Sequence, residues 1–126
     1  MNVVVVDTSS WISYFAGQQQ EALDLALQEG RVYLSPVVAA ELMSGSLSRT
    51  RREQLADFLR DLPLCDAGLE HWLRVGTQRS RLARKGLTVS TPDVHVAQCA
   101  IDLGGYLLSE DRIFRRLVRH CRLRLL

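Results

Sequence analysis

Val3-Val4-Val5-Val6-Asp7-Thr8-Ser9 is the stretch that decides the fold of this chain. Four consecutive β-branched residues without polar alternation predict a strand buried on both faces, as in the centre of a parallel sheet. Ligands of such sheets bind just beyond the carboxyl ends of the strands, where Asp7 stands. Asp7 and Ser9 are equally common at the start of a helix, as capping or turn residues, so this stretch alone does not define a site.

The stretch Tyr106-Leu107-Leu108-Ser109-Glu110-Asp111 repeats this design later in the chain. An apolar segment again predicts a strand, and it again ends in a hydroxyl and an aspartate. Because parallel strands present their carboxyl ends at the same edge of a sheet, we expect Asp7 and Asp111 to lie at that edge.

Composition places the chain among ordinary globular proteins, with 126 residues, 47% of them hydrophobic and 24% charged. Neither a membrane span of roughly 18 apolar residues nor a signal-peptide pattern is recognised, so we expect a cytoplasmic protein without membrane contact. The widely spaced Cys65, Cys99 and Cys121 favour neither a disulfide framework nor a zinc site, and are expected to be reduced core residues. All but one of the 16 basic residues are arginines, which favours an anionic partner.

Strands and helices alternate along the rest of the chain. Further strands are predicted over 32–34, 64–65 and 123–125. Helices are predicted over 9–16, 21–29, 36–45, 53–62, 68–85, 91–101 and 112–120, with a polar, basic loop over 46–52. Ser35 and Thr91, each followed by proline, are expected to cap helices. This order predicts a single α/β domain over residues 1–126, a three-layer sandwich whose mostly parallel sheet has five strands.

Two acidic residues stand where apolar residues are expected. Glu41 follows Val37 and Val38 by four and three residues, which places it on the face of its helix toward the sheet. Asp93 heads a stripe of small and apolar residues, namely Val96, Ala97, Ala100 and Ile101. Each acid has an ordinary alternative. Asp93 can complement the helix dipole in a first turn, and Glu41 can lie at the boundary of a helix turned slightly further.

Asp7, Glu41, Asp93 and Asp111 come from four predicted elements and can converge at one edge of the sheet. Two carboxylates about 4 Å apart repel by roughly 4 kcal/mol at an intermediate dielectric, so such a cluster requires cations. Oxygen ligands without cysteine or histidine select hard ions, Mg²⁺ or Mn²⁺. Ser9 and Ser109 are candidates for orienting the carboxylates or waters.

Four segments resemble the PIN domain family and, within it, the VapC-type ribonuclease toxins of toxin–antitoxin pairs. They read VVVVDTSSWI, SPVVAAEL, RLARKGL and TPDVHVAQCAIDLGGYLLSEDRIF. The resemblance implies a metal-dependent endoribonuclease whose metal-binding, catalytic carboxylates match Asp7, Glu41, Asp93 and Asp111. It also implies a sheet with strand order 3-2-1-4-5, an RNA substrate, a VapB-type antitoxin, and a homodimer that forms a heterotetramer or larger assembly with it. Ile113 stands where a further acid can occur in the family, so the number of metals stays open.

Arginines follow the last of these acids at helical spacing, which places Arg112, Arg115, Arg116 and Arg119 on one face of a predicted helix. They are candidates for binding RNA phosphates, with a solvated face or a contact for an acidic antitoxin segment as alternatives. No metal-ligand spacing relates His71, His95 and His120, and no role is predicted for them.

Two other classes of function stay open. One is a PIN-fold RNA- or protein-binding module with little activity. The other is a receiver-type phosphoacceptor domain, which would use Asp66 after the third strand. Against the receiver, Asp7 has no acidic neighbour, and the single Lys85 is far from any strand end.

Overall fold

A short parallel sheet with β1 at its centre organises the computed structural model, which describes residues 2–126. β1 (Val4–Val6) pairs in parallel with β2 (Val32–Tyr33) and β3 (Tyr106–Leu108), in the order β2-β1-β3. All three β1 residues are buried, as the run of valines predicts. The predicted domain over 1–126 also includes Met1, which lies outside the described residues.

Three of the five predicted strands are formed within residues 2–126. Leu64 makes a single parallel bridge to Leu34, and Leu125 makes one to Leu107. Both segments therefore lie beside the strands expected, but each pairs through one residue. Beyond Leu64, the Asp66 side chain accepts a hydrogen bond from Gly68 N–H at 3.1 Å, and this turn leads the backbone away from the sheet.

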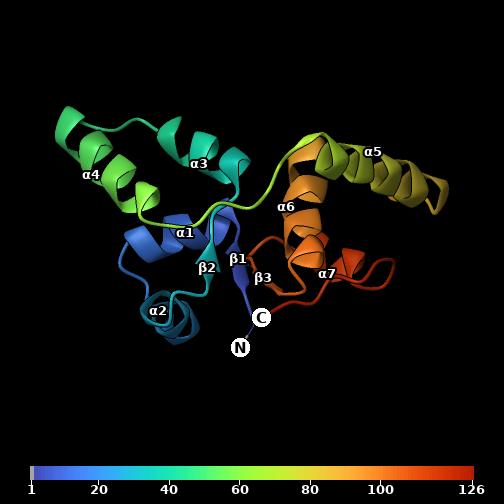
Figure 1. Cartoon of the computed structure of the whole chain (residues 1–126), viewed down its shortest axis with the longest axis horizontal. Helices are drawn as coiled ribbons and strands as arrows, with labels where there is room; N and C mark the ends of the chain where they lie inside the picture. Colours follow the sequence, from blue (N-terminus) through green and yellow to red (C-terminus); the bar gives the residue numbers. More distant parts are fainter. Residues whose placement is uncertain (1) are drawn as a thin grey trace.

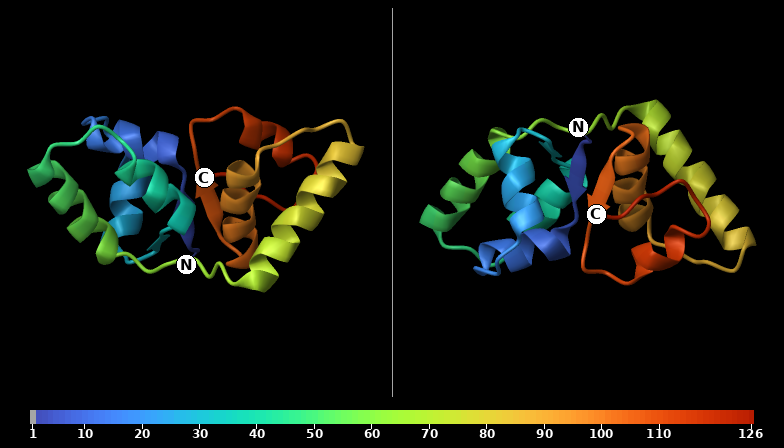
Figure 2. Two further views of the ribbon diagram at one scale, coloured as in Figure 1. Left: turned by 90° about the horizontal axis from the view of Figure 1, so that it is seen from above. Right: turned by 90° about the horizontal axis from the view of Figure 1, so that it is seen from below.

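Helices lie on both sides of the sheet (Figure 1). One group comprises α1 (Thr8–Phe15), α2 (Glu21–Gln28), α3 (Pro36–Met43) and α4 (Arg49–Arg60). The other comprises α5 (Leu69–Arg84), α6 (Thr91–Asp102) and α7 (Ile113–Leu117). Figure 2 shows the same division from above and below, with the sheet between the two groups. The carboxyl ends of β1 and β3 thus lie between helices from both groups.

The core follows the apolar pattern of the sequence. Trp11 and Phe114 are its largest fully buried side chains, and they come from helices of the two different groups. In α6 every residue from Val94 to Ala100 is buried, so this helix is surrounded by protein on all sides. Cys65 and Cys99 are buried free thiols and Cys121 is a half-buried one, as expected.

Among the differences from the predicted helices, three concern α4, α6 and α7. Ser48 accepts a hydrogen bond from Arg51 N–H at 3.2 Å and caps α4, so the predicted loop over 46–52 ends before Arg49. Ser90, rather than Thr91, caps α6. α7 ends at Leu117, three residues earlier than predicted. Among the described residues, no helix combines the length and apolar character needed to cross a membrane.

Candidate metal and nucleic-acid site

Asp7 lies at the junction between β1 and α1. Its backbone carbonyl accepts hydrogen bonds from Ser10 and Trp11 N–H at 3.1 and 3.2 Å, which begins α1. The side chain does not cap the helix. Oδ2 instead accepts hydrogen bonds from Ser109 Oγ at 2.9 Å and Ser9 Oγ at 3.3 Å. These contacts orient a carboxylate that is only 8% exposed.

Ser9 and Ser109 also fix the chain that follows β3. Glu110 N–H donates to Ser9 Oγ at 3.1 Å, and Asp111 N–H donates to Ser109 Oγ at 3.0 Å. The two hydroxyls therefore link the start of α1 to the end of β3. The structure thus brings both serines against Asp7, where the sequence suggested that they could orient a carboxylate.

Glu41 is exposed rather than turned toward the sheet. Val38 and Leu42 occupy the buried face of α3, so the helix is turned further than the apolar spacing predicts. Glu41 Oε1 accepts a hydrogen bond from Thr8 Oγ1 at 2.8 Å. Sequence reasoning did not single out Thr8, although its position directly after Asp7 is a signal that could have found it.

Asp93 is half-buried at the start of α6, and its N–H donates to the capping Ser90 Oγ at 3.3 Å. Burial raises the pKa of its carboxyl above the ordinary value, against an opposing effect of Ser90. The negative charges of the other site acids raise this pKa further, and those acids are Asp111, Asp7 and Glu41. Asp93 therefore lies within electrostatic reach of all three.

Asp111 is exposed in the turn between β3 and α7, and its Oδ1 accepts a hydrogen bond from Ile113 N–H at 3.1 Å. The carboxylate thus fixes the start of α7. Ile113, at the position of the possible further acid, is half-buried.

No basic side chain of the described residues lies within salt-bridge distance of Asp7, Glu41, Asp93 or Asp111. Elsewhere, arginines pair with Glu29, Glu53, Asp57 and Asp102. The negative charge of the four acids is thus left uncompensated in a chain that is rich in arginine. Carboxylate oxygens are the ligands that Mg²⁺ and Mn²⁺ prefer, so the donor set fits these ions.

The four acids nevertheless do not form a closely gathered set of ligand atoms. In the part of the chain that the structure describes, three potential ligand atoms come within 4.8 Å of one another only at His71, His95 and Cys99. The arrangement of the acids is that of an edge lined by like charges.

All four predicted phosphate-binding arginines are exposed: Arg112, Arg115, Arg116 and Arg119. α7 includes only the middle two, because Arg112 precedes the helix and Arg119 follows it. The predicted single helical face is therefore wrong in detail. The exposed guanidinium groups still lie along the segment that begins directly after Asp111.

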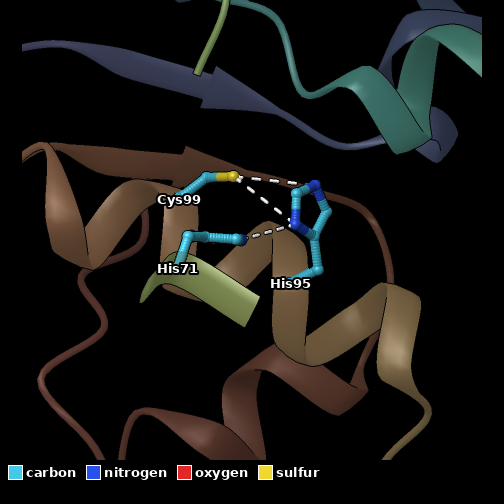
Figure 3. A group of neighbouring side chains, drawn as sticks. All are labelled: His71, His95 and Cys99. Carbon is cyan, nitrogen blue, oxygen red and sulfur yellow. Dashed lines mark hydrogen bonds between the residues drawn. The ribbon is translucent and has the colours of Figure 1, made fainter. Parts of the chain in front are cut away.

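Two histidines for which the sequence predicts no role form a buried cluster with Cys99 (Figure 3). His71 Nε2 lies 2.7 Å from His95 Nδ1, and the ring of Trp72 stacks on that of His95 with centroids 4.6 Å apart. Burial and the neighbouring His71 lower the pKa of His95 to about 4, so the His95 ring is neutral near pH 7. The sequence could have indicated that His95 is bonded inside the protein. A helix as apolar as 94–101 is expected to be buried all round, and a histidine within it requires a hydrogen-bond partner.

Residues 4–119 match the PIN domain family, and the chain belongs to that family. Its fold is similar to solved structures of VapBC complexes. The DNA-bound VapBC of Salmonella typhimurium is 23% identical, with a TM-score of 0.81 over 100% of this chain and 98% of that chain. VapBC2 of Rickettsia felis, bound to a promoter DNA fragment, is 21% identical, with a TM-score of 0.79 over 98% of this chain and 97% of that chain. VapBC-5 of Mycobacterium tuberculosis is 23% identical, with a TM-score of 0.71 over 100% of this chain and 98% of that chain. A comparison with curated proteins found no match.

Proposed function

We propose that this PIN domain is a divalent-metal-dependent endoribonuclease that hydrolyses RNA phosphodiester bonds. One observation carries the proposal: Ser109 links Asp7 to the backbone of Asp111, Thr8 beside Asp7 bonds Glu41, and no basic residue of the described chain pairs with the four acids. A bound divalent cation would compensate this negative charge and draw the carboxylates together. We assign metal binding and catalysis to Asp7, Glu41, Asp93 and Asp111.

A bound Mg²⁺ or Mn²⁺ would activate water for attack and stabilise the negative charge that develops on a phosphodiester. The protein's part is to hold the ligands ready. The hydroxyls of Ser9 and Ser109 donate hydrogen bonds to Oδ2 of Asp7, and no hydrogen bond from the described residues reaches Oδ1. Oδ1 is therefore available to a cation. Thr8 orients Glu41 in the same way. Ligands held by such outer partners need no reorganisation when the ion binds.

The arginines after Asp111 are assigned to substrate binding. Their exposed guanidinium groups, on Arg112, Arg115, Arg116 and Arg119, suit phosphate oxygens because each offers a fork of N–H donors. Their position beside the acids would direct the RNA backbone across the site.

We further propose that the protein is the toxin of a toxin–antitoxin pair, acting on RNA in the cytoplasm. The family membership and the similarity to VapBC complexes support this role. A groove of about 480 Å³ beside α1 and α4 is lined by Phe15, Leu47, Leu55 and Phe58, with Arg51 and Gln54 as its polar residues. Phe15 is 46% exposed and the neighbouring Ile12 is 58% exposed, so an apolar segment of a VapB-type antitoxin would bury both. A homodimer that forms a heterotetramer or larger assembly with this antitoxin completes the proposal.

Cleavage of a mixed RNA pool tests the nuclease. The purified chain, free of antitoxin, is incubated with Mn²⁺, with Mg²⁺ or with EDTA, alongside Asp93→Asn and the control Asp66→Asn. Asp66 is an exposed acid outside the four-acid set, and asparagine can keep its turn contact to Gly68. We expect metal-dependent cleavage by the wild type and the control, and none by Asp93→Asn.

A folded wild type that leaves every RNA intact with either metal would refute the nuclease. RNA binding without cleavage would then identify a PIN-fold binding module. Membership of the PIN family already replaces the receiver-type hypothesis. We also propose that the sheet has the strand order 3-2-1-4-5, with the bridged segments at Leu64 and Leu125 as its outer strands. Protection of their amides from hydrogen exchange would test this order.

A further inference from the structure

A continuous chain of hydrogen bonds, buried except at its Asp102 end, crosses from the start of α3 to the end of α6. Ser35 Oγ lies 2.7 Å from His95 Nε2, and His95 Nδ1 lies 2.7 Å from His71 Nε2. His71 Nδ1 then lies 3.1 Å from Asp102 Oδ2. Ser35 and His95 are fully buried, and His71 is 2% exposed.

The direction of every bond in this chain follows from its acidic end. Asp102 also accepts hydrogen bonds from Arg74 and Gln98, which counteract the effect of burial and hold the pKa of its carboxyl below the ordinary value. The carboxylate can only accept, so His71 donates from Nδ1, and in the neutral form of the ring its Nε2 accepts from His95 Nδ1–H. His95 Nε2 is then an acceptor for the Ser35 hydroxyl.

The Ser35 oxygen is used a second time, because it caps α3. It accepts hydrogen bonds from Val37 and Val38 N–H, both at 3.2 Å. All members of the chain are therefore satisfied, from the amide groups of α3 to the guanidinium of Arg74. A fully satisfied buried network holds its elements in one arrangement, whereas a broken one leaves polar atoms without partners.

The same cluster does not have the geometry of a metal site. Two nitrogens on one tetrahedral zinc ion lie about 3.3 Å apart, whereas His71 Nε2 and His95 Nδ1 lie 2.7 Å apart. Cys99 Sγ lies 3.9 Å from Nδ1 and 3.7 Å from Nε2 of His95. A sulfur nearly equidistant from both ring nitrogens is not placed to share an ion held by one of them. The hydrogen-bonded arrangement accounts for these distances, and the metal-bound one does not.

The chain joins the two helices that carry Glu41 and Asp93. Ser35 begins α3, on which Glu41 lies, and His95 follows Asp93 by two residues on α6. We propose that Ser35, His95, His71 and Asp102 form a positioning network that holds α3 against α6, so that Glu41 and Asp93 can bind the same cation. This inference rests on the proposed metal site and adds the residues that fix the distance between Glu41 and Asp93.

Mn²⁺ affinity, measured by calorimetry without RNA, tests the network. His95→Leu removes both ring contacts, while His95→Gln keeps a polar group near the Nε2 position, within reach of the Ser35 hydroxyl. We expect about tenfold weaker Mn²⁺ binding in His95→Leu and Ser35→Ala, which is typical for loss of outer partners of a metal site, and near wild-type binding in His95→Gln. Leu23→Ala, a buried substitution in α2, controls for a general loss of stability.

A second result comes from the double variant. If the two side chains act through one contact, Ser35→Ala combined with His95→Leu should weaken Mn²⁺ binding no more than either change alone. Should one single variant fail to fold, the other is compared with the Leu23→Ala control in the same assay.

Each opposite outcome refutes a different claim. A folded His95→Leu or Ser35→Ala that binds Mn²⁺ like the wild type overturns the positioning network while leaving the metal site intact. A wild type that binds Mn²⁺ no better than Asp93→Asn overturns the proposed site itself. Purified protein that holds one zinc ion per chain, lost equally in His95→Gln and His95→Leu, replaces the hydrogen-bonded network with a metal cluster.

Discussion

Gly105→Ala should destabilise the fold at the contact that joins β3 to β1. A methyl group on Gly105 would overlap Val3 O and lie 2.9 Å from Val3 C, so backbone rather than a flexible side chain must move. Tyr106 N–H donates to the same Val3 O at 2.9 Å. The added methyl therefore forces the strands apart where their pairing begins.

The expected cost has two contributions. Overpacking of a close contact costs about 1–3 kcal/mol, and loss of the Tyr106 hydrogen bond adds about 1 kcal/mol. The free energy of unfolding should therefore fall by about 2–4 kcal/mol, out of roughly 5–15 kcal/mol for a domain of this size. The midpoint of thermal unfolding should fall by about 4 °C for each of these kcal/mol.

Urea unfolding followed by tryptophan fluorescence measures the effect, because Trp11 is fully buried in the folded state. Gly76→Ala is the matched control. Gly76 lies inside α5, and a methyl group added there would have no neighbour within 4 Å, so alanine should raise stability by about 0.5–1 kcal/mol. A Gly105→Ala protein whose stability lies within about 0.5 kcal/mol of the wild type, the usual range for a neutral substitution, would refute the argument from close approach.

Three further predictions concern pH, substrate and metal. In EDTA, the free energy of unfolding should fall by up to about 3 kcal/mol between pH 6.5 and 4. The reason is that the unfolded chain takes up a proton on His95, whereas the folded chain, in which the pKa of His95 is about 4, excludes it. Urea unfolding should show this contribution to the pH dependence in the wild type and not in His95→Gln. The ring faces His71, Ser35 and Cys99, none of which supplies a negative charge that would favour the imidazolium. Alanine at both Arg115 and Arg116 should weaken RNA binding and reduce its logarithmic salt slope by about 1.4, measured by filter binding, and an unchanged slope would exclude phosphate contacts. Thr8→Val should weaken Mn²⁺ binding about tenfold because Glu41 loses its donor, while Ser13→Ala, which removes the equivalent contact to Glu110, should not.

The centre of the fold could be predicted because it depends on local composition. Four consecutive valines are typical of a central parallel strand, and the structure confirms β1 at the centre of the sheet. The outer strands were harder to predict. Whether a segment as short as Leu64 and Cys65 forms a strand depends on the neighbouring strand with which it pairs, and not on its own composition. Here Leu64 forms a single bridge before a turn begins at Asp66.

Helix rotation explains why one acid was placed correctly and another was not. Asp93 lies in the first turn of α6, directly before the fully buried stretch from Val94 to Ala100, and it is half-buried there. α3 has only eight residues and a mostly apolar sequence, so periodicity gives its rotation poorly, and Glu41 lies on the exposed face. The contact from Thr8 compensates, because it reaches Glu41 from α1.

The histidine network could not be predicted from spacing, because its members are far apart in sequence. His71 and His95 are separated by 24 residues, and Ser35 and His95 by 60. Patterns within one helix find ligands at three or four residues, whereas this chain of contacts depends on how α3, α5 and α6 pack. Only the burial of His95 could be anticipated, and burial implies a partner without identifying it.

α6 carries a residue of the acidic site, Asp93, and a residue of the histidine network, His95, on separate faces. Residues two positions apart in a helix point roughly 200° away from each other, so Asp93 and His95 lie on opposite faces of α6. A second carboxylate in place of His95 would carry the full desolvation cost of a buried charge. A neutral imidazole with both nitrogens bonded is tolerated there, and it can fix the distance to α3 without adding charge near the acids. Loss of metal affinity with Asp93 still in place is therefore the result that would distinguish this arrangement from an ordinary buried histidine.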